Sequence, residues 1–302
     1  MGIIDFLMQG DPIIQRLTSK YLLGQDEAYF ETGYIKRYLE RFDDKKQMWG
    51  DGIYSPKWIS THYTMLELKN LEIDPKHPIY HLGLETLLKH LWQKEGVVNK
   101  RRHQDLCVVG MLVSMVSYGE KKDERLYEMI DYLLSHQIET GGFNCMWETT
   151  PTKVASVHAT LSILEGFRDF LKLEGSYRLT EIKEAILKAE EALLRRELYK
   201  KMGTHDPIHP FMIEVHYPNR WKYDILRALR YFVSVNHPYD ERMKDAMNLL
   251  VSKMKKGKLP QGKMISGLIH FNYKDEGRFN TLHFLEVLKK YRPNLYDRLL
   301  EG

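Results

Sequence analysis

Ionisable and aromatic side chains recur along this chain at the starts of segments that the sequence predicts to be helical. The set comprises Trp58 and His62, His103 and Asp105, His158, Trp221, Tyr223 and Asp224, and Arg278 and Asn280. Histidine and carboxylate groups that converge on one cavity can transfer protons during a reaction. We therefore expect Asp105 and Asp224 to act as acid or base, and His62 and His158 as proton carriers or ligands. The alternative is that these groups only cap helices and fill the centre of the fold with hydrogen bonds.

Aromatic and basic residues beside the same helix starts could bind a substrate. Trp58 and Trp221 are the expected walls of the site, because indole rings offer large apolar faces. The remaining expected substrate-binding residues are Trp49, Tyr63, Arg101, Arg102, His103, Trp147, Tyr223 and Arg278. Most aromatic residues of a globular chain lie in its core, and core packing remains the alternative for each tryptophan.

The clearest positioning unit runs from Glu139 to Phe167. Apolar residues at the spacing of a helix precede Gly141 and Gly142, and glycine just past a helix is a common terminator. Residues 143–152 have no period and predict a loop, after which the helical pattern returns at Val154. One face of this second helix carries the small residues Ala155, Ala159, Ser162 and Gly166. Small residues allow a neighbouring helix to approach closely.

Weaker copies of this helix–loop–helix unit recur along the chain, and two classes of helix alternate. The more charged class comprises residues 79–92, 124–138, 179–199 and 240–254. The more apolar class follows longer loops and comprises residues 57–71, 105–118, 154–170, 221–233 and 279–291. Recurrent helical hairpins predict an all-α fold, an α/α toroid of about five to six hairpins with inner and outer layers. We expect one domain over residues 1–302, with N-terminal helices within 12–42 packing where the ring closes.

Composition limits the classes of function. The chain has 302 residues, 28% charged and 43% hydrophobic, as expected for a globular protein with a sizeable core. A net charge of +4 does not favour nucleic-acid binding, so we expect a small-molecule substrate; oligomeric state stays open. The apolar run 107–116 is too short to span a bilayer, and the N-terminus lacks the pattern of a secretory signal. The two cysteines, Cys107 and Cys145, give no disulfide framework, which predicts a cytoplasmic location.

One stretch resembles a known superfamily. Gly141-Gly142-Phe143 is followed by a helix that contains His158-Ala159-Thr160-Leu161, then Leu164 and Gly166. This pattern resembles the terpenoid cyclase and protein prenyltransferase superfamily, in which a Gly-Gly-aromatic loop leads into an inner helix of an α/α toroid like that of squalene–hopene cyclases. The resemblance implies an enzyme, a transferase or cyclase, acting on an isoprenoid or another hydrophobic substrate.

The resemblance also implies a metal site. In the protein prenyltransferases an Asp-x-Cys pair and a histidine at the next inner helix hold zinc, and Asp105, Cys107 and His158 occupy comparable positions here. Arg101 and Arg102 precede them where the family places cations for a diphosphate, whose negative charge they stabilise. The chain departs from the family at Val108, where a tyrosine is usual. From the residues themselves, a helix cap at Asp105 and a buried thiol at Cys107 remain the alternative.

Two further functions stay open. An α/α barrel can also host sugar chemistry, which needs two carboxylates across the substrate, and Asp105 with Asp224 or Glu148 could supply them. The third reading is a non-catalytic scaffold that binds a ligand or another protein.

Overall fold

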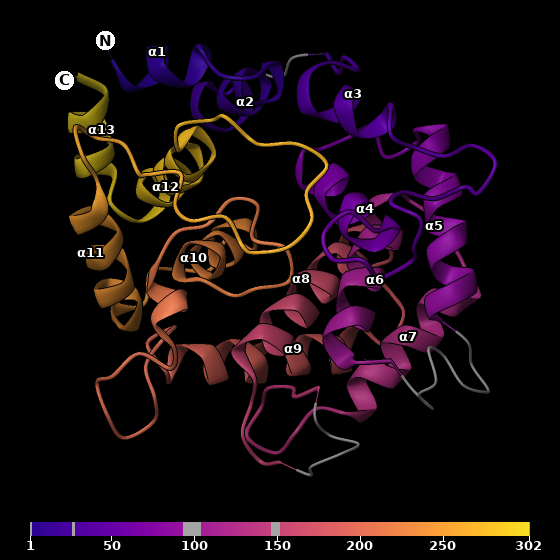
Figure 1. The fold of residues 1–302 in the computed structure, drawn as a ribbon. Helices are drawn as coiled ribbons and strands as arrows, with labels where there is room; N and C mark the ends of the chain where they lie inside the picture. Colours follow the sequence, from indigo (N-terminus) through magenta and orange to yellow (C-terminus); the bar gives the residue numbers. More distant parts are fainter. Residues whose placement is uncertain (1, 26–27, 93–103, 146–151, 302) are drawn as a thin grey trace. The chain divides into compact units, whose positions relative to one another are not determined.

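The computed structural model describes residues 2–25, 28–92, 104–145 and 152–301, and within them it contains no β-strand, only three isolated bridges. The helices of this described part, in chain order (Figure 1), are α1 (Ile3–Met8), α2 (Pro12–Thr18), η1 (Ser19–Leu23), α3 (Gly33–Leu39), α4 (Thr61–Asn70), α5 (Pro78–Leu91), α6 (Leu106–Tyr118), α7 (Glu124–Ser135), α8 (Val157–Leu173), α9 (Leu179–Leu194), η2 (Pro210–Ile213), α10 (Ile225–Ser234), η3 (Glu241–Met243), α11 (Lys244–Lys253), α12 (Arg278–Tyr291) and α13 (Pro293–Glu301). The predicted all-α class is therefore confirmed. None of the helices described is long and apolar enough to cross a membrane.

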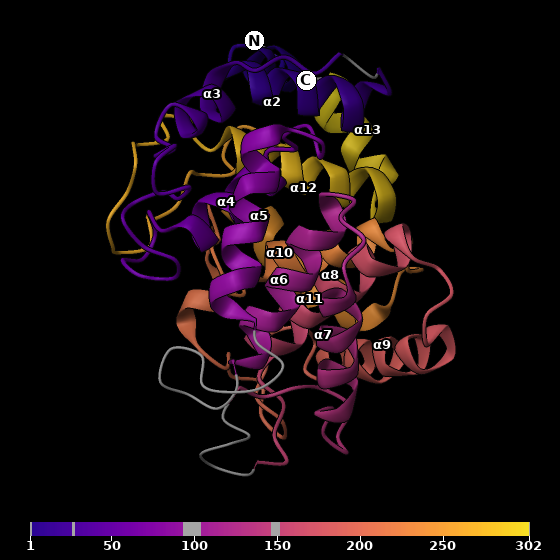
Figure 2. The same ribbon diagram turned by 90° about the vertical axis from the view of Figure 1, so that its right-hand side faces the viewer.

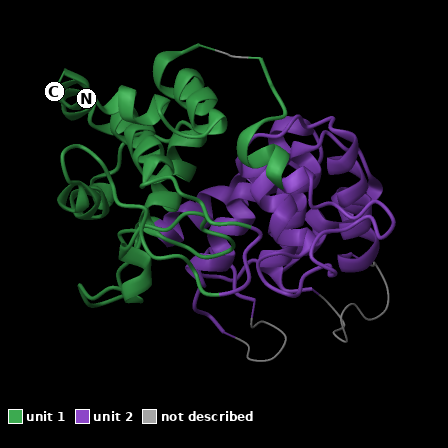
Figure 3. Cartoon of the chain, turned by 45° about the horizontal axis from the view of Figure 1, so that its top comes forward, with its two compact units in different colours: residues 1–37, 194–266, 271–302 green, residues 38–193, 267–270 purple. Residues whose placement is uncertain are grey.

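The chain packs as two compact units, drawn in two colours in Figure 3. Unit 1 comprises residues 1–37, 194–266 and 271–302, and unit 2 comprises residues 38–193 and 267–270.

In unit 2, α6 and α8 lie against each other at backbone distance. A Cβ atom added to Gly166 of α8 would lie 2.6 Å from the carbonyl oxygen of Gly110 in α6. One added to Gly110 would lie 2.9 Å from the Cα atom of Ile163. Neither distance is tolerated by a real side chain, so both glycines are required by the helix crossing. The sequence predicted a close approach on the small-residue face that contains Gly166, and the contact with Gly110 confirms it.

The helices of unit 2 differ in burial as the sequence predicted. In α6 every residue from Val108 to Ser117 is buried. In α7 only one face is buried, formed by Leu126, Met129, Ile130 and Leu133. A helix apolar on all sides must be covered on all sides, whereas a helix with one apolar stripe packs by that stripe alone.

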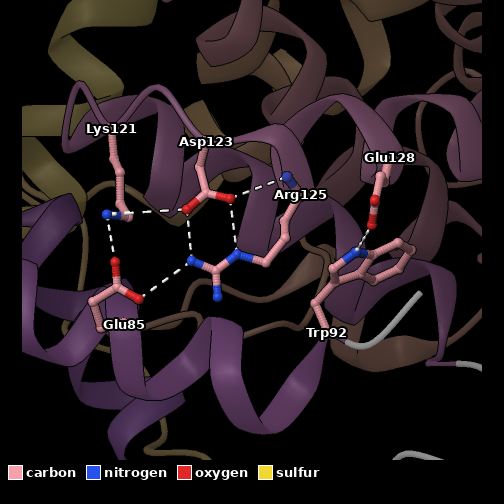
Figure 4. Close-up of polar contacts among 6 residues, drawn as sticks. All are labelled: Glu85, Trp92, Lys121, Asp123, Arg125 and Glu128. Atoms are coloured by element: carbon pink, nitrogen blue, oxygen red, sulfur yellow. Dashed lines mark hydrogen bonds and ion pairs between the residues drawn. The ribbon is translucent and has the colours of Figure 1, made fainter. Parts of the chain in front are cut away.

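Charged residues tie α5 to the start of α7 in unit 2 (Figure 4). The Arg125 guanidinium donates to both carboxylate oxygens of Asp123, at 2.8 and 2.6 Å, and to Glu85 at 3.2 Å. Lys121 lies 2.5 Å from Glu85. These hydrogen bonds lower the pKa of Asp123, where the Arg125 bond is the largest cause, and of Glu85, where the Lys121 bond is. Because Glu85 is half exposed, the network fixes geometry more than it adds stability.

A threonine hydroxyl joins each of three helices to the loop that precedes it. In α8, the Thr160 hydroxyl accepts from the backbone N–H of Phe143 at 3.1 Å and donates to the carbonyl of Phe143 at 3.4 Å. Thr281 of α12 brackets Leu259 in the same way, at 3.0 and 3.4 Å. Thr61 of α4 accepts from the N–H of Trp49 at 3.1 Å and donates to the carbonyl of Gly52 at 2.9 Å. The predicted repeat of the helix–loop unit thus has a common side-chain contact at α4, α8 and α12.

We expect Thr160→Val to lower the free energy of unfolding by about 1–3 kcal/mol, because it leaves the buried N–H of Phe143 without an acceptor. Thr160→Ser keeps the hydroxyl and is expected to retain most of the stability. Urea denaturation of the two variants measures the difference. Equal stability of the valine and serine variants would show that the Thr160 hydroxyl does not stabilise the fold.

In unit 1 the N-terminal helices pack on the C-terminal part of the chain. Helices α1 and α2 and the π-helical turn η1 contact α12, and α1 also contacts α13. The two chain ends accordingly lie close together in Figures 1 and 2. Helix α12 also packs against α10. The N-terminal helices therefore pack on α12 within this unit, and the closure of a ring stays a prediction.

Candidate functional site

The start of α4 is built by the loop that precedes it. The backbone N–H groups of Thr61 and His62 donate to the carbonyls of Gly52 and Ile53, both at 2.9 Å. The first turn of a helix leaves such N–H groups without partners inside the helix, and here the loop satisfies them. A Cβ atom on Gly52 would lie 1.7 Å from the carbonyl oxygen of Ser55, so only glycine allows this path. The predicted helix 57–71 therefore begins at Thr61, and Trp58 lies in the loop.

Four rings gather at this helix start and form what we term the ring cluster: Tyr54, Trp58, His62 and Tyr63. The His62 ring centroid lies 5.2 Å from that of Tyr54 and 5.1 Å from that of Tyr63. Tyr63 lies 5.3 Å from Tyr54 and 4.8 Å, edge-on, from Trp58. Of these four, Trp58, His62 and Tyr63 were predicted as site residues from the sequence, and the structure brings them together.

His62 is the unusual member of the ring cluster. Its side chain is fully buried, and neither ring nitrogen has a hydrogen-bond partner. Burial alone lowers its pKa from 6.5 to about 3. The imidazole is therefore neutral at neutral pH and retains one nitrogen lone pair able to accept a proton. An unsatisfied buried polar group costs stability, so its presence calls for a functional reason.

Tyr54 forms the half-buried side of the ring cluster. Its pKa is raised to about 12, first by burial and then by the charges of Cys107, Asp105 and Cys145, while Tyr63 opposes the shift. The hydroxyl thus remains protonated at neutral pH. The start of α6 and Cys145 are thus near enough to Tyr54 to act on it electrostatically, and α4 and α6 contact each other. Asp105 and Cys107, both predicted site residues, belong to this neighbourhood.

Residues 267–270, also in unit 2, run alongside Trp58. The backbone N–H of Trp58 donates to the carbonyl of Leu268 at 3.4 Å, and the N–H of Leu268 donates to the carbonyl of Lys57 at 3.2 Å. Gly267 has a φ of 146° and lies so close to the indole that a Cβ atom would be 2.2 Å from Nε1 of Trp58. This segment therefore fixes the position of the Trp58 ring.

We expect Gly267→Ala to displace the Trp58 indole, because the added methyl group would overlap it. The tryptophan emission spectrum should shift while the far-UV circular dichroism of the helices stays the same. Gly175→Ala, where no atom lies within 4 Å of the new Cβ, is the matched control. An emission spectrum identical to that of the parent chain would show that Gly267 does not hold the ring.

Trp49 has a packing role in this structure. Its side chain is fully buried, its indole N–H donates to the carbonyl of Tyr38 at 2.8 Å, and its ring packs on Phe42. It anchors the loop before α4, which agrees with core packing, the alternative to its expected role in substrate binding. His158, the second residue of α8, is half-buried.

The predicted residues in unit 1 are held by contacts that stabilise the fold. Asp224 is fully buried and caps α10, accepting from the N–H of Arg227 at 2.8 Å and from the side chain of Asn219. Burial is the largest influence on its pKa, which is raised to about 7. The Tyr223 hydroxyl donates to the carbonyl of Leu198 at 2.5 Å. Helix α10 begins at Ile225, so Trp221, which is half-buried, lies in the preceding loop and not in a helix.

Arg278 likewise contacts the chain itself. Its guanidinium donates to the carbonyl of Phe6 at 2.8 Å and to that of Asp275 at 3.1 Å, and it lies 4.3 Å from the Phe6 ring centroid. It links α12 to α1. Tyr223 and Arg278 thus have structural roles, and their binding of a substrate stays a prediction.

Some predicted residues lie outside the described residues. They are Arg101, Arg102, His103 and Trp147, together with Glu148 of the carbohydrate hypothesis.

The predicted zinc ligands do not form a metal site here. Within residues 2–25, 28–92, 104–145 and 152–301, no group of three or more His, Cys, Asp and Glu side chains could hold a metal ion. The thiol of Cys107 interacts instead with the thiol of Cys145, which raises the pKa of Cys107. Among the described residues, Asp105, Cys107 and His158 therefore do not gather into a zinc site.

Two residues of the site were missed from the sequence. Tyr54 lies in the same glycine- and aromatic-rich loop as Trp58, and that composition was its only signal. Cys145 lies two residues after Phe143 in the loop that the sequence singled out, but nothing in its spacing pointed to Cys107.

No protein-family model matches the chain, and no curated protein matches it. The resemblance of the Gly141-to-Gly166 stretch to terpenoid cyclases and prenyltransferases thus rests on those residues alone.

Proposed function

We propose that this chain is an enzyme that converts an isoprenoid or similar hydrophobic substrate at the ring cluster, with His62 as the proton acceptor. The observation that carries the proposal is the buried, unpartnered imidazole of His62 among the rings of Tyr54, Trp58 and Tyr63.

The chemistry of a carbocation suits these groups. A carbocation makes no hydrogen bonds, but aromatic ring faces attract it, by up to about 2 kcal/mol per ring when water is excluded. The Lys57 ammonium already lies 5.5 Å from the Tyr54 ring centroid and 5.8 Å from that of Trp58, so these rings do receive a cation. A carbocation reaction ends when a base removes a proton. The pKa of His62, about 3, leaves it neutral and ready to accept that proton from a strongly acidic cation.

The carbohydrate hypothesis has less support. It needs two carboxylates that contact the substrate from opposite sides. Asp224 is fully buried and engaged by Arg227 and Asn219, so its carboxylate is occupied in capping α10.

We also propose that the alternating helices close into an α/α toroid, as the resemblance implies. The threonine contact shared by α4, α8 and α12 supports a repeated unit, and the packing of α1 and α2 on α12 supports closure within unit 1. A crystal structure with an open superhelix would contradict this part of the proposal.

Incubation of the purified protein with C15 and C20 prenyl diphosphates and with a set of oligosaccharides tests the function. Products are identified by gas chromatography with mass spectrometry, and by chromatography of the sugars. We expect hydrocarbon or alcohol products, lost in Trp58→Leu and retained in the control Trp92→Phe, whose indole contacts Glu128 outside the ring cluster. Turnover of sugars alone, or binding without turnover of either class, would reject the isoprenoid enzyme.

A further inference from the structure

The sulfur of Cys145 occupies the N-terminus of α6. It accepts a hydrogen bond from the backbone N–H of Cys107 at 3.2 Å, and the N–H of Leu106 also contacts it. Asp105 holds the N-cap position, yet its side chain makes no cap hydrogen bond to the helix. Cys145, from the loop after Gly141-Gly142-Phe143, therefore supplies the acceptor that the first turn of α6 needs.

Cys107 is the second residue of the same helix, so the backbone contact brings the two cysteines together although 38 positions separate them. Both side chains are partly exposed and neither is in a disulfide. The interaction between the two thiols is the largest influence on the pKa of each. It lowers the pKa of the Cys145 thiol, to which the backbone N–H groups add, and it raises the pKa of the Cys107 thiol. Helix N-termini stabilise thiolates in this way.

We propose that Cys107 and Cys145 form an oxidant-reactive dithiol site, with Cys145 as the attacking thiolate, Cys107 as the resolving thiol and a hydroperoxide as the co-reactant. The inference does not depend on the proposed isoprenoid chemistry. It assigns thiol chemistry to the partly exposed pair Cys107 and Cys145.

The reaction has two steps. The Cys145 thiolate attacks one oxygen of hydrogen peroxide, the O–O bond breaks, and sulfenic acid and hydroxide form. The Cys107 thiol then attacks the sulfenic sulfur, the S–O bond breaks, and a disulfide and water form. Overall, two thiols and one peroxide give one disulfide and two waters, so the two electrons lost by sulfur reduce the peroxide.

A disulfide at this position would join the loop of Cys145 covalently to the first turn of α6. Both thiols influence the pKa of Tyr54 electrostatically. Oxidation is therefore expected to change the surroundings of the Tyr54 hydroxyl, which reports on the reaction by ultraviolet difference absorption.

The test treats the full-length protein with stoichiometric hydrogen peroxide and determines its intact mass and peptide map. We expect the loss of two hydrogen atoms from the monomer and a peptide linking Cys107 to Cys145. Before oxidation, iodoacetamide should modify Cys145 at least about tenfold faster than Cys107 at neutral pH. The same labelling in urea is the control, because both thiols should react alike once the helix is unfolded.

Single variants separate the two roles. Cys107→Ser treated with peroxide should accumulate a sulfenic acid on Cys145, trapped as its dimedone adduct, whereas Cys145→Ser should give no adduct on Cys107. A peroxide-treated parent protein that keeps two free thiols, that links cysteines only between molecules, or that is alkylated first at Cys107 would overturn the proposal. Iodoacetamide labelling of the parent protein tests the proposed roles of Cys145 and Cys107 even if a variant fails to fold.

Discussion

Replacement of His62 by leucine is expected to maintain or raise the free energy of unfolding while it strongly lowers the rate of turnover. The two ring nitrogens are buried without hydrogen bonds, a condition that costs about 1–3 kcal/mol for each unsatisfied group. Leucine is similar in size and has no polar atom to desolvate, so the variant should be as stable as the parent chain or more stable. Loss of the proton acceptor should lower the rate by about 10²–10⁴-fold. Gain in stability with loss of activity is the pattern of a functional residue.

The pH dependence of stability gives a second signature of His62. Its pKa is about 3 in the folded chain and 6.5 when unperturbed, so only the unfolded chain takes up a proton between these values. Stability is therefore complete above pH 6.5 and is lost as the pH falls toward 3, by about 1.4 kcal/mol per pH unit from this group. At pH 5 the parent chain should have lost about 2 kcal/mol more than His62→Leu.

Urea denaturation at pH 7 and pH 5 measures both effects. His90→Leu is the control, since His90 is exposed on α5 and its replacement should leave the pH dependence unchanged. A His62→Leu chain that is markedly less stable at pH 7 and keeps the parent's pH dependence would make His62 a structural residue.

Asp169→Asn is expected to destabilise unit 2 by about 3–5 kcal/mol, the usual result of removing one member of a buried ion pair. The Asp169 carboxylate lies 2.9 Å from Lys69 of α4 and 2.8 Å from Arg168, and it accepts from the Ser114 hydroxyl of α6 at 2.6 Å. It thereby joins α4, α6 and α8. The side chains of Lys69 and Asp169 are only 11% and 9% exposed, so solvent cannot replace the lost partner.

The pKa of Asp169 shows which influence dominates. Burial raises it, but Lys69 and Arg168 outweigh burial and hold the pKa well below its usual range. Because the folded pKa is depressed, the stabilisation is present above the unfolded value of 3.8 and is lost as the pH falls toward the folded value.

Thermal and urea unfolding of Asp169→Asn test this network, with the exposed pair Lys46 and Asp51 as the comparison. Asp51→Asn should change stability by less than about 1 kcal/mol. The double variant Asp169→Leu with Lys69→Met should recover part of the loss, because neither charge remains buried. A loss below about 1 kcal/mol in Asp169→Asn would show that the network adds nothing beyond a surface pair.

The sequence predicted those features of the fold that depend on local periodicity. The apolar run that became α6 and the one-sided pattern of α7 were sufficient for the helix classes. The predicted helix end was wrong: α7 ends at Ser135 with His136 at its C-cap, before Gly141 and Gly142. Helix starts were less predictable. The start of α4 depends on the carbonyls of Gly52 and Ile53, which no periodic pattern reveals.

The site was predictable only in part, because its members meet through tertiary packing. His62 and Trp58 were identified from residue type, but their contact with Tyr54 depends on the path of the loop through Gly52. Tyr223 and Arg278 have the residue types of a binding site, but backbone carbonyls of Leu198 and Phe6 accept their hydrogen bonds. Residue type alone cannot distinguish a binding residue from a structural one, because the hydrogen-bond partners of Tyr223 and Arg278 lie 25 and 272 positions away in the chain.

The proposed function is tested most directly by calorimetric titration of the protein with two compounds, an isoprenoid amine and its neutral all-carbon isostere. The amine carries a positive charge, as a carbocation does. If the ring cluster stabilises a cation beside a neutral His62, the amine should bind at least about tenfold more tightly, and the difference should disappear in Trp58→Leu. Equal affinity for the two compounds, or tighter binding of the neutral one, would contradict the proposed function.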